Sequence, residues 1–479
     1  MKIKQLIPAA LSLFGLTTAV QAQKKPNILF ILIDDMGYPA IQCYGNKMVK
    51  TPNIDKIAEQ GVKFTQGYVC PQSTPTRANL LTGQYSCRNQ MWHVVPKYGW
   101  PNARVKEPEY LDNLPREQFT IAEALKTAGY TTALIGKWHL STYDNDGYYT
   151  YLYPDKARFY GFDYVNPKQN PTEYSGYGDK GVDFLTDETI HFMEKNKNQP
   201  FFIFLSHHTV HNRVLAPKDL VKKYLDLGYP ETGLNFAEYL AAIEHLDNSV
   251  GRLQTKMKEL GIDKNTIVFF VSDNGGVDSQ LSNSPLRYGK GTAYEGGTRV
   301  PFIVQWPEKI KGGIINTTPV HIVDIYPTLL DVAKTKPAPN HVLDGVNLMP
   351  ILFGNKNAKA KLANRPIYFY QPLYDLLWGA TPSASMVEGD YKLIWFFGDY
   401  IDRDNNNKYI TEGRMELYNL KEDIGEKHDL ALSNSDKVNK MKEKLQAFIL
   451  ESGSIIPGLN DKYNPEIWNV RLPNNKKEE

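Results

Sequence analysis

Oxygen-bearing side chains follow two expected buried strands, at the point where each strand ends. They are Asp34 and Asp35 after the apolar run 27–33, and Asp273 and Asn274 after the run 266–271. Because α/β sheets place their sites at the carboxyl ends of strands, we expect these four side chains to meet. A hard, oxygen-only ligand set of this kind suits Ca²⁺ or Mg²⁺ rather than Zn²⁺. Solvated acids in two ordinary turns are the alternative interpretation.

A second candidate site lies in the stretch 69–83, which contains Ser73. Thr74 is a suitable N-cap for a short helix, Pro75 suits its first helical position and Gly83 its end. The free N–H groups and positive dipole at such a helix start favour an anion. Arg77, in the first turn, adds a cation with a fork of donors. We therefore expect an anion site beside Ser73, with an ordinary capping segment as the alternative.

Basic side chains occupy comparable positions elsewhere in the chain. Lys137 and His139 follow the expected strand 130–135, from which both can point into a cleft. Lys290 lies in the glycine-rich stretch 289–297, whose backbone can approach a ligand closely. For the first pair, an exposed lysine and a satisfied structural histidine are the alternative.

Three of the ten histidines fall within five residues after the expected strand 201–205. They are His207, His208 and His211. Clustered imidazoles are typical of transition-metal sites, so this stretch introduces a second possible ligand chemistry.

The stretch 73–83 resembles the signature of type I sulfatases, which is Cys or Ser, any residue, Pro, Ser or Thr, Arg, and then Leu-x-Thr-Gly. The matching positions are Ser73, Pro75, Thr76, Arg77, Leu80, Thr82 and Gly83. Family elements Gly-Lys-x-His and Gly-Lys-Gly-x-x-x-Glu-Gly-Gly recur at 136–139 and 289–297, in the family order. The resemblance spans roughly residues 26–430. One departure is Val210, which replaces the usual proline of a Pro-His pair, so the choice among the three clustered histidines stays open although His211 best fits the spacing.

The resemblance implies an α/β fold of the alkaline-phosphatase type. Its central sheet is mixed and mostly parallel with helices on both faces, and a smaller C-terminal α+β subdomain carries an antiparallel sheet. We expect a signal peptide at 1–22, a catalytic domain at 23–365 and the C-terminal subdomain at 366–479.

The resemblance also implies a covalent mechanism that depends on an oxidised residue 73. A maturase converts Ser73 to formylglycine (3-oxoalanine), whose hydrate attacks the sulfur of a sulfate ester with a Ca²⁺-bound hydroxyl. His139 then deprotonates the second hydroxyl and releases sulfate, while His211, alone or with Lys290, protonates the leaving oxygen. The implied catalytic residues are Ser73, Arg77, Lys137, His139, His211 and Lys290, and the implied metal ligands are Asp34, Asp35, Ser73, Asp273 and Asn274.

Apolar runs and helical spacing supply the elements that position these residues. Besides the strands already given, we expect a strand at 301–306 and helices at 51–59, 74–83, 119–128, 184–195, 236–260 and 321–332. After about residue 365, short strands at 367–370, 384–387, 392–397 and 416–420 precede a helix at 436–451.

The start of the chain predicts export to a periplasm or the medium. Lys2 and Lys4 precede the apolar run 6–20 and a small-residue cleavage site ending at Ala22, without a cysteine for a lipid anchor. Loss of the two lysines changes the formal net charge from +2 to zero. A neutral chain lacks the basic field that gathers nucleic acid or an anionic membrane. The three cysteines, Cys43, Cys70 and Cys87, do not form a disulfide framework.

The expected substrate is a sulfated carbohydrate cleaved at a chain end. The irregular region 141–178 holds nine tyrosines, which either build a small core or offer stacking surfaces. The expected substrate contacts are His207, His208, Asn212, Arg213 and Trp378, with Tyr374 as a further aromatic surface. Two alternatives are a phosphoesterase or phosphonate hydrolase of the same superfamily and a non-catalytic glycan-binding homologue.

Overall fold

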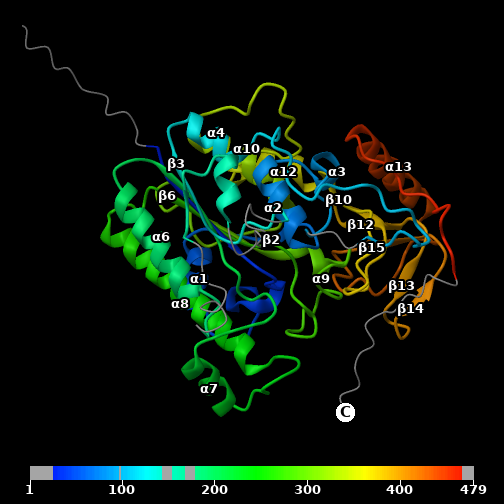
Figure 1. The fold of residues 1–479 in the computed structure, drawn as a ribbon, viewed down its shortest axis with the longest axis horizontal. Coiled ribbons are helices and arrows are strands. Elements are labelled where there is room, and N and C mark those ends of the chain that lie inside the picture. Colours follow the sequence, from blue (N-terminus) through cyan, green and yellow to red (C-terminus); the bar gives the residue numbers. More distant parts are fainter. Residues whose placement is uncertain (1–24, 96–98, 143–153, 168–177, 466–479) are drawn as a thin grey trace, which may run out of the picture.

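The structure is a computed structural model that describes residues 25–95, 99–142, 154–167 and 178–465 (Figure 1). The expected signal peptide and seven of the nine tyrosines of region 141–178 lie outside the described residues. The other two, Tyr160 and Tyr164, pack against Trp138 and Phe192, as a small core requires. Within the described part of the chain, no helix has the length and apolar character needed to cross a membrane.

A mixed sheet forms the centre of the larger part of the molecule. Its strand order is β4 (Tyr164–Val165), β3 (Thr131–Gly136), β5 (Phe201–Ser206), β1 (Asn27–Ile33), β6 (Thr266–Ser272), β7 (Arg299–Gln305), β2 (Val62–Tyr68) and β8 (Ile314–Asn316), with β9 (Val320–His321) also beside β2. Only β7 runs against its two neighbours, and the other described pairs are parallel. The expected mostly parallel sheet is therefore confirmed.

Helices cover both faces of this sheet because alternate residues of the buried strands point to opposite sides (Figure 1). Phe30 of β1 belongs to the core beneath α2 (Ser73–Thr82), α4 (Ile121–Thr127) and α10 (Ile325–Ala333). Ile31 belongs to the opposite core, beneath α1 (Pro52–Glu59), α6 (Val182–Asn196) and α8 (Ala237–Glu259), beside which α7 (Lys218–Asp226) packs. Every residue of β1 is buried, which explains its continuous apolar run.

The C-terminal part is a smaller antiparallel sheet covered by one helix. The strand order is β10 (Ile367–Gln371), β11 (Ser383–Glu388), β12 (Tyr391–Phe396) and β15 (Arg414–Asn419), with the separate hairpin β13 (Tyr400–Asp402) and β14 (Lys408–Ile410). Helix α13 (Ser435–Glu451) buries Met441, Leu445 and Ile449 against it. The ring of Phe448 stacks on Tyr368 with centroids 3.9 Å apart. The expected four strands and helix are confirmed, and a boundary at 365/366 stays a prediction.

Several elements differ from the expectation, among them helix α2 and strand β2. Helix α2 begins at Ser73 rather than after it, with Gln72 in the N-cap position. Thr74 does not cap the helix, since its hydroxyl donates instead to the carbonyl of His139. Gly83 ends the helix as expected, with φ of +66°. Strand β2 was not expected, because its mixed, half-buried sequence lacks the long apolar run of the central strands.

Candidate functional site

The ends of β1 and β6 bring the four expected oxygen ligands together. These strands are parallel neighbours, and Ile33 pairs with Ser272 at their last position. The backbone N–H of Asp35 donates to Asp273 Oδ1 at 3.1 Å, and Asn274 Nδ2 donates to Asp35 Oδ1 at 2.8 Å. All four side chains are almost fully buried. The position predicted from strand ends is therefore where the oxygens converge.

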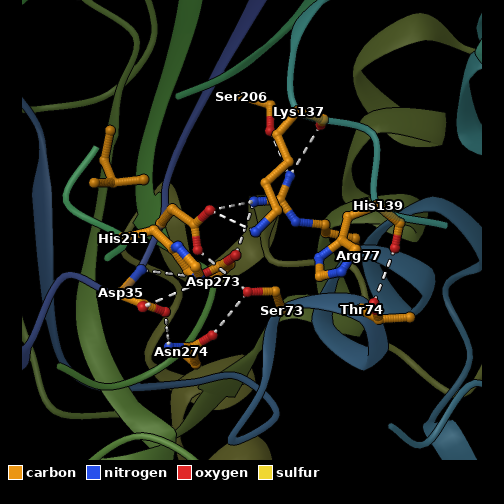
Figure 2. A network of polar contacts seen from close by, with 12 residues as sticks. Asp35, Ser73, Thr74, Arg77, Lys137, His139, Ser206, His211, Asp273 and Asn274 are labelled. Carbon is orange, nitrogen blue, oxygen red and sulfur yellow. Dashed lines mark hydrogen bonds and ion pairs between the residues drawn. The ribbon is translucent and has the colours of Figure 1, made fainter. Parts of the chain in front are cut away.

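Ser73 lies within this oxygen set (Figure 2). Its Oγ donates to Asp34 Oδ1 at 3.2 Å and is 3.1 Å from Asn274 Oδ1. Helix α2 carries Ser73 at its first residue, so the side chain lies at the positive end of the helix. Ser73 is almost fully buried, with 1% of its surface exposed.

Three buried cations, Arg77, Lys137 and Lys290, contact the carboxylates, and Figure 2 labels Arg77 and Lys137. Arg77 pairs with Asp273 at 2.8 Å, and its guanidinium also donates to the Lys137 carbonyl and the Ser206 hydroxyl. Lys137 Nζ donates to Asp34 Oδ2 at 2.6 Å. Lys290, which Figure 2 does not label, donates from Nζ to Asp35 Oδ2 at 2.8 Å. Each expected cation thus contacts one of the expected carboxylates.

The site has balanced charge before any ligand binds. Three carboxylates (Asp34, Asp35 and Asp273) face three cations (Arg77, Lys137 and Lys290), all buried. Buried charge without compensation is costly, so ligands that enter together should also balance. A divalent cation and a dianion meet that condition.

The pKa values of Asp34 and Asp273 are shifted in opposite directions. Burial alone would raise the pKa of Asp34, but Lys137, His211 and Arg77 hold it well below its usual range. Burial and the neighbouring Asp34 raise the pKa of Asp273 to about 6. Asp34 is thus charged in the neutral range, while the charged form of Asp273 would be favoured by a neighbouring cation.

Two of the expected histidines have neutral rings at the site. Burial, with Lys137 and Arg77, holds the pKa of His139 well below its usual range. Burial lowers the pKa of His211 to about 4, although Asp35 and Asp34 oppose this shift. His211 Nε2 lies 4.0 Å from Asp35 Oδ2, and 39% of the His211 side chain is exposed. His211 is therefore the one of the three clustered histidines that joins the carboxylates at an open side of the site.

The clustered histidines do not assemble a transition-metal site within the described residues. One possible metal group there contains Asp34, Asp35 and His211, and the other contains Asp179, Asp183 and His245. Neither includes His207 or His208. His208 is also buried, and burial holds the pKa of its ring well below the usual range. The charge of Lys137 lowers this pKa further, while that of Asp34 raises it.

His207 is fully buried, and the ionisable groups that act on its ring are His245 and Asp179 rather than the charged residues around Ser73, so the expected substrate contact stays a prediction. Neither ring nitrogen has a hydrogen-bond partner among the described residues. Burial, and secondarily His245, lowers the pKa of His207 to about 3. The ring is thus a neutral part of the fold beneath the site.

Because the pKa of His207 is low, we expect acid to lower the free energy of unfolding, and we expect substitution of His207 to lessen this effect. An unfolded histidine gains a proton near pH 6.5 while folded His207 stays neutral, so acid favours unfolding below that pH. At pH 5 this contribution amounts to about 2 kcal/mol. We expect His207→Phe to lessen the fall in unfolding free energy between pH 7 and 5 by about 2 kcal/mol, measured by urea unfolding.

A loss of packing would shift the His207→Phe curve equally at every pH, so the slope is the informative quantity. His191→Phe, at an exposed position of α6, is the matched control. A His207→Phe protein with the pH dependence of the unchanged chain would contradict the prediction.

The remaining expected substrate contacts lie at the edge of the site. Asn212 and Arg213 are exposed on the turn that follows His211. Trp378 is half-buried, and Lys290 Nζ lies 5.2 Å from the centre of its ring. Tyr374 is buried, with its hydroxyl donating to Asp399, so it offers no stacking surface.

Several side chains at the site were not expected from the sequence. Ser206, at the end of β5, contacts Arg77, and its strand-end position is a signal that could have identified it. Lys180 donates to the carbonyls of His211 and Arg213 and so holds that turn. Burial lowers the pKa of Lys180 to about 8. No motif marks Lys180, because its role depends on a turn some 30 residues away in the chain.

Comparisons with known proteins agree with this geometry. The family profile described as Sulfatase matches residues 26–335, and the one described as N-sulphoglucosamine sulphohydrolase, C-terminal, matches residues 287–452. A relative named sulfatase from Formosa agariphila is 30% identical over 91% of each chain. N-acetylgalactosamine-6-sulfatase from Rattus norvegicus is 28% identical over 95% of this chain and 91% of its own. The crystal structure of Ps i-CgsB in complex with k-i-k-neocarrahexaose is 28% identical, with a TM-score of 0.72 over 90% of this chain and 94% of its own.

The family match covers well over half of the chain, and the relatives align over nearly their whole length. The mixed sheet with its C-terminal antiparallel sheet is the alkaline-phosphatase-like fold of these neighbours. The chain therefore belongs to the sulfatase family, whose members are sulfuric ester hydrolases.

Proposed function

We propose that this protein is an exported sulfatase that removes sulfate esters from the chain ends of sulfated carbohydrates. The observation that carries the proposal is the position of Ser73 Oγ, 3.2 Å from Asp34 Oδ1 and 3.1 Å from Asn274 Oδ1, among buried cations. The relative from Rattus norvegicus is named for a sulfated sugar, and the Ps i-CgsB structure holds an oligosaccharide. Export rests on the first 22 residues of the sequence.

The oxygens around Ser73 fit a hard divalent cation. Asp34, Asp35, Asp273 and Asn274 offer carboxylate and amide oxygens without sulfur, which favours Ca²⁺, with Mg²⁺ as the alternative. Such an ion, held also by residue 73, supplies positive charge that stabilises the sulfuryl oxygens and the attacking group. The balanced charge of the buried side chains accommodates such an ion together with the sulfate dianion that hydrolysis releases, whereas the intact sulfate ester is a monoanion.

Residue 73 is proposed to act as formylglycine, produced by a maturase that oxidises serine. The hydrated aldehyde supplies one hydroxyl for attack on sulfur and a second whose deprotonation releases sulfate. An unmodified serine has only one hydroxyl. It can accept the sulfuryl group, but it has no second hydroxyl whose deprotonation releases sulfate. The helix dipole at Ser73 favours the negative charge that develops there.

The surrounding side chains have distinct roles in this proposal. Arg77, Lys137 and Lys290 offset charge on the sulfuryl oxygens, since all three already lie against the carboxylates. His139, whose ring is neutral, accepts the proton that leaves residue 73. His211, on the open side with Asp35, donates a proton to the leaving oxygen after gaining one from solvent or a neighbour.

The proposal predicts that sulfate is released faster from sugar sulfates than from aryl sulfates. A panel of galactose, glucose and N-acetylhexosamine 6-sulfates is assayed beside 4-nitrophenyl sulfate and 4-nitrophenyl phosphate, with sulfate and phosphate measured by ion chromatography. We expect kcat/KM for at least one sugar sulfate to exceed that for the aryl sulfate roughly tenfold or more, because binding energy from the sugar accelerates the reaction. Faster phosphate release would favour the phosphoesterase alternative, and aryl turnover without any sugar turnover would overturn the substrate class.

A further inference from the structure

A polar cluster beside Ser73 joins the two parts of the chain and has no role in the mechanism described above. Gln72, the residue before Ser73, donates from Nε2 to Asp375 Oδ2. His93 Nε2 lies 3.6 Å from the same Asp375 oxygen. Asp375 belongs to the connection between β10 and β11, whose local turn is closed by backbone hydrogen bonds between Asp375 and Ala380.

This turn forms part of the wall around the candidate site. Gln371 Nε2 donates to the Gly291 carbonyl at 2.9 Å, next to Lys290. Gly291 has φ of +81°, and a Cβ there would lie 2.4 Å from Trp378 Cβ, so only glycine permits this packing. Lys290 joins the turn to the site, because its Nζ contacts Asp35 and lies 5.2 Å from the Trp378 ring centre.

The cluster has polar atoms that the described residues leave unsatisfied. Gln72 and His93 are 1% and 3% exposed, yet Gln72 Oε1 and His93 Nε2 have no hydrogen-bond partner among those residues. Buried polar groups without partners are costly, and a cluster that merely joined two domains would be expected to satisfy them. The Asp375 side chain is 11% exposed, so a bound molecule can reach the cluster.

We propose that Asp375, assisted by Gln72 and His93, binds hydroxyl groups of the sugar ring that carries the sulfate ester, an inference that rests on the proposed sulfatase function. A carboxylate accepts hydrogen bonds from two hydroxyls, while the free amide oxygen and imidazole nitrogen bind others. Trp378 provides an apolar face for the same ring, beside Lys290. The sugar held by this cluster is uncharged apart from its reacting sulfate, because Asp375 would repel a carboxylate or second sulfate placed there.

The first test compares substrates in an Asp375→Asn variant. The amide keeps the size of the side chain but replaces one acceptor oxygen by a donor. With matured protein, we expect the ratio of kcat/KM for the best sugar 6-sulfate to that for 4-nitrophenyl sulfate to fall about 100-fold, since the aryl ester lacks hydroxyl groups at these positions. A ratio that stays constant while both activities fall would show that Asp375 only holds the two parts together and would overturn the inference.

Asp278→Asn is the matched control. Asp278 pairs with Arg403 of the C-terminal part at 2.7 Å, so the change also weakens a contact between the two parts. It lies outside the Gln72–His93–Asp375 cluster, and we expect it to leave the substrate ratio unchanged. A similar fall in this variant would overturn the assignment to Asp375.

The second test pairs the variant with deoxy substrates. Each free ring hydroxyl is removed in turn from the best sugar 6-sulfate, and kcat/KM is measured for the unchanged protein and for Asp375→Asn. For one analogue, we expect about a 100-fold loss with the unchanged protein and less than a threefold further loss with the variant, because both changes remove the same contact. If, for every analogue, the loss caused by the missing hydroxyl is as large in the variant as in the unchanged protein, the inference is overturned.

The outcomes separate this inference from the function on which it rests. Matured protein that releases sulfate from no ester would refute the sulfatase proposal itself. Sulfate release with a substrate ratio insensitive to Asp375→Asn would refute only the sugar-binding cluster.

Discussion

Protein produced in a host that cannot oxidise serine is expected to release sulfate at less than about a thousandth of the rate of matured protein. Unmodified Ser73 retains its contacts with Asp34 and Asn274 but lacks the second hydroxyl needed to release sulfate. Co-production with a maturase that accepts serine should restore turnover in proportion to the fraction of residue 73 converted. That fraction is measured by mass spectrometry of the peptide that contains residue 73.

Two substitutions at the same position sharpen this experiment. Ser73→Ala should remain inactive with any maturase, since alanine offers no oxygen to oxidise. Ser73→Cys should become active in a host whose maturase oxidises cysteine, because the family signature accepts either residue at this position. Full turnover by a preparation whose residue 73 is intact serine would refute the formylglycine proposal.

Asp273→Asn is expected to lose the bound metal and turnover together, with kcat falling about 1,000-fold or more. The change replaces one charged carboxylate oxygen of the proposed ligand set by an amide nitrogen, while the side chain keeps its shape beside Arg77. We prefer asparagine to alanine because the amide oxygen can still accept a hydrogen bond from Arg77, whereas alanine leaves that buried donor without an acceptor on residue 273. Calcium and magnesium per chain are measured by elemental analysis, and folding by thermal unfolding.

Asp179→Asn is the control for metal loss. Asp179 lies with Asp183 and His245 in the other described group that could hold an ion, so this change tests which group accounts for the metal. We expect the Asp179 variant to keep its full metal content. Stoichiometric zinc without calcium or magnesium in the unchanged protein would contradict the oxygen-only ligand set.

The sequence determined the position of most of the site because the signals are local. A continuous apolar run indicates a strand buried on both faces, and residues after it lie at the strand end, as Asp34 and Asp273 do. Pro75 and Gly83 likewise predict a short helix within one stretch of chain. The start of that helix was misplaced by one residue, because Thr74 donates to the distant His139 carbonyl instead of capping.

Tertiary structure decided how the clustered histidines differ in burial. His207 and His211 are four residues apart, but the first is enclosed beneath the site and the second is partly exposed beside Asp35. The family spacing favoured His211 but left the choice open, because burial depends on the elements that pack around the end of β5. The same holds for β2, whose half-buried residues become a strand only between β7 and β8.

The contacts of Gln72, His93 and Lys180 likewise depend on segments that are distant in the chain. Asp375 reaches Gln72 across a separation of 303 residues, and Lys180 reaches the His211 turn across 31. No periodicity or motif in the sequence indicates contacts between residues so far apart in the chain. The sequence therefore determined the buried central strands, the presence of the short helix and the charged groups of the candidate site, whereas packing of the C-terminal sheet against the central domain decided which side chains surround that site.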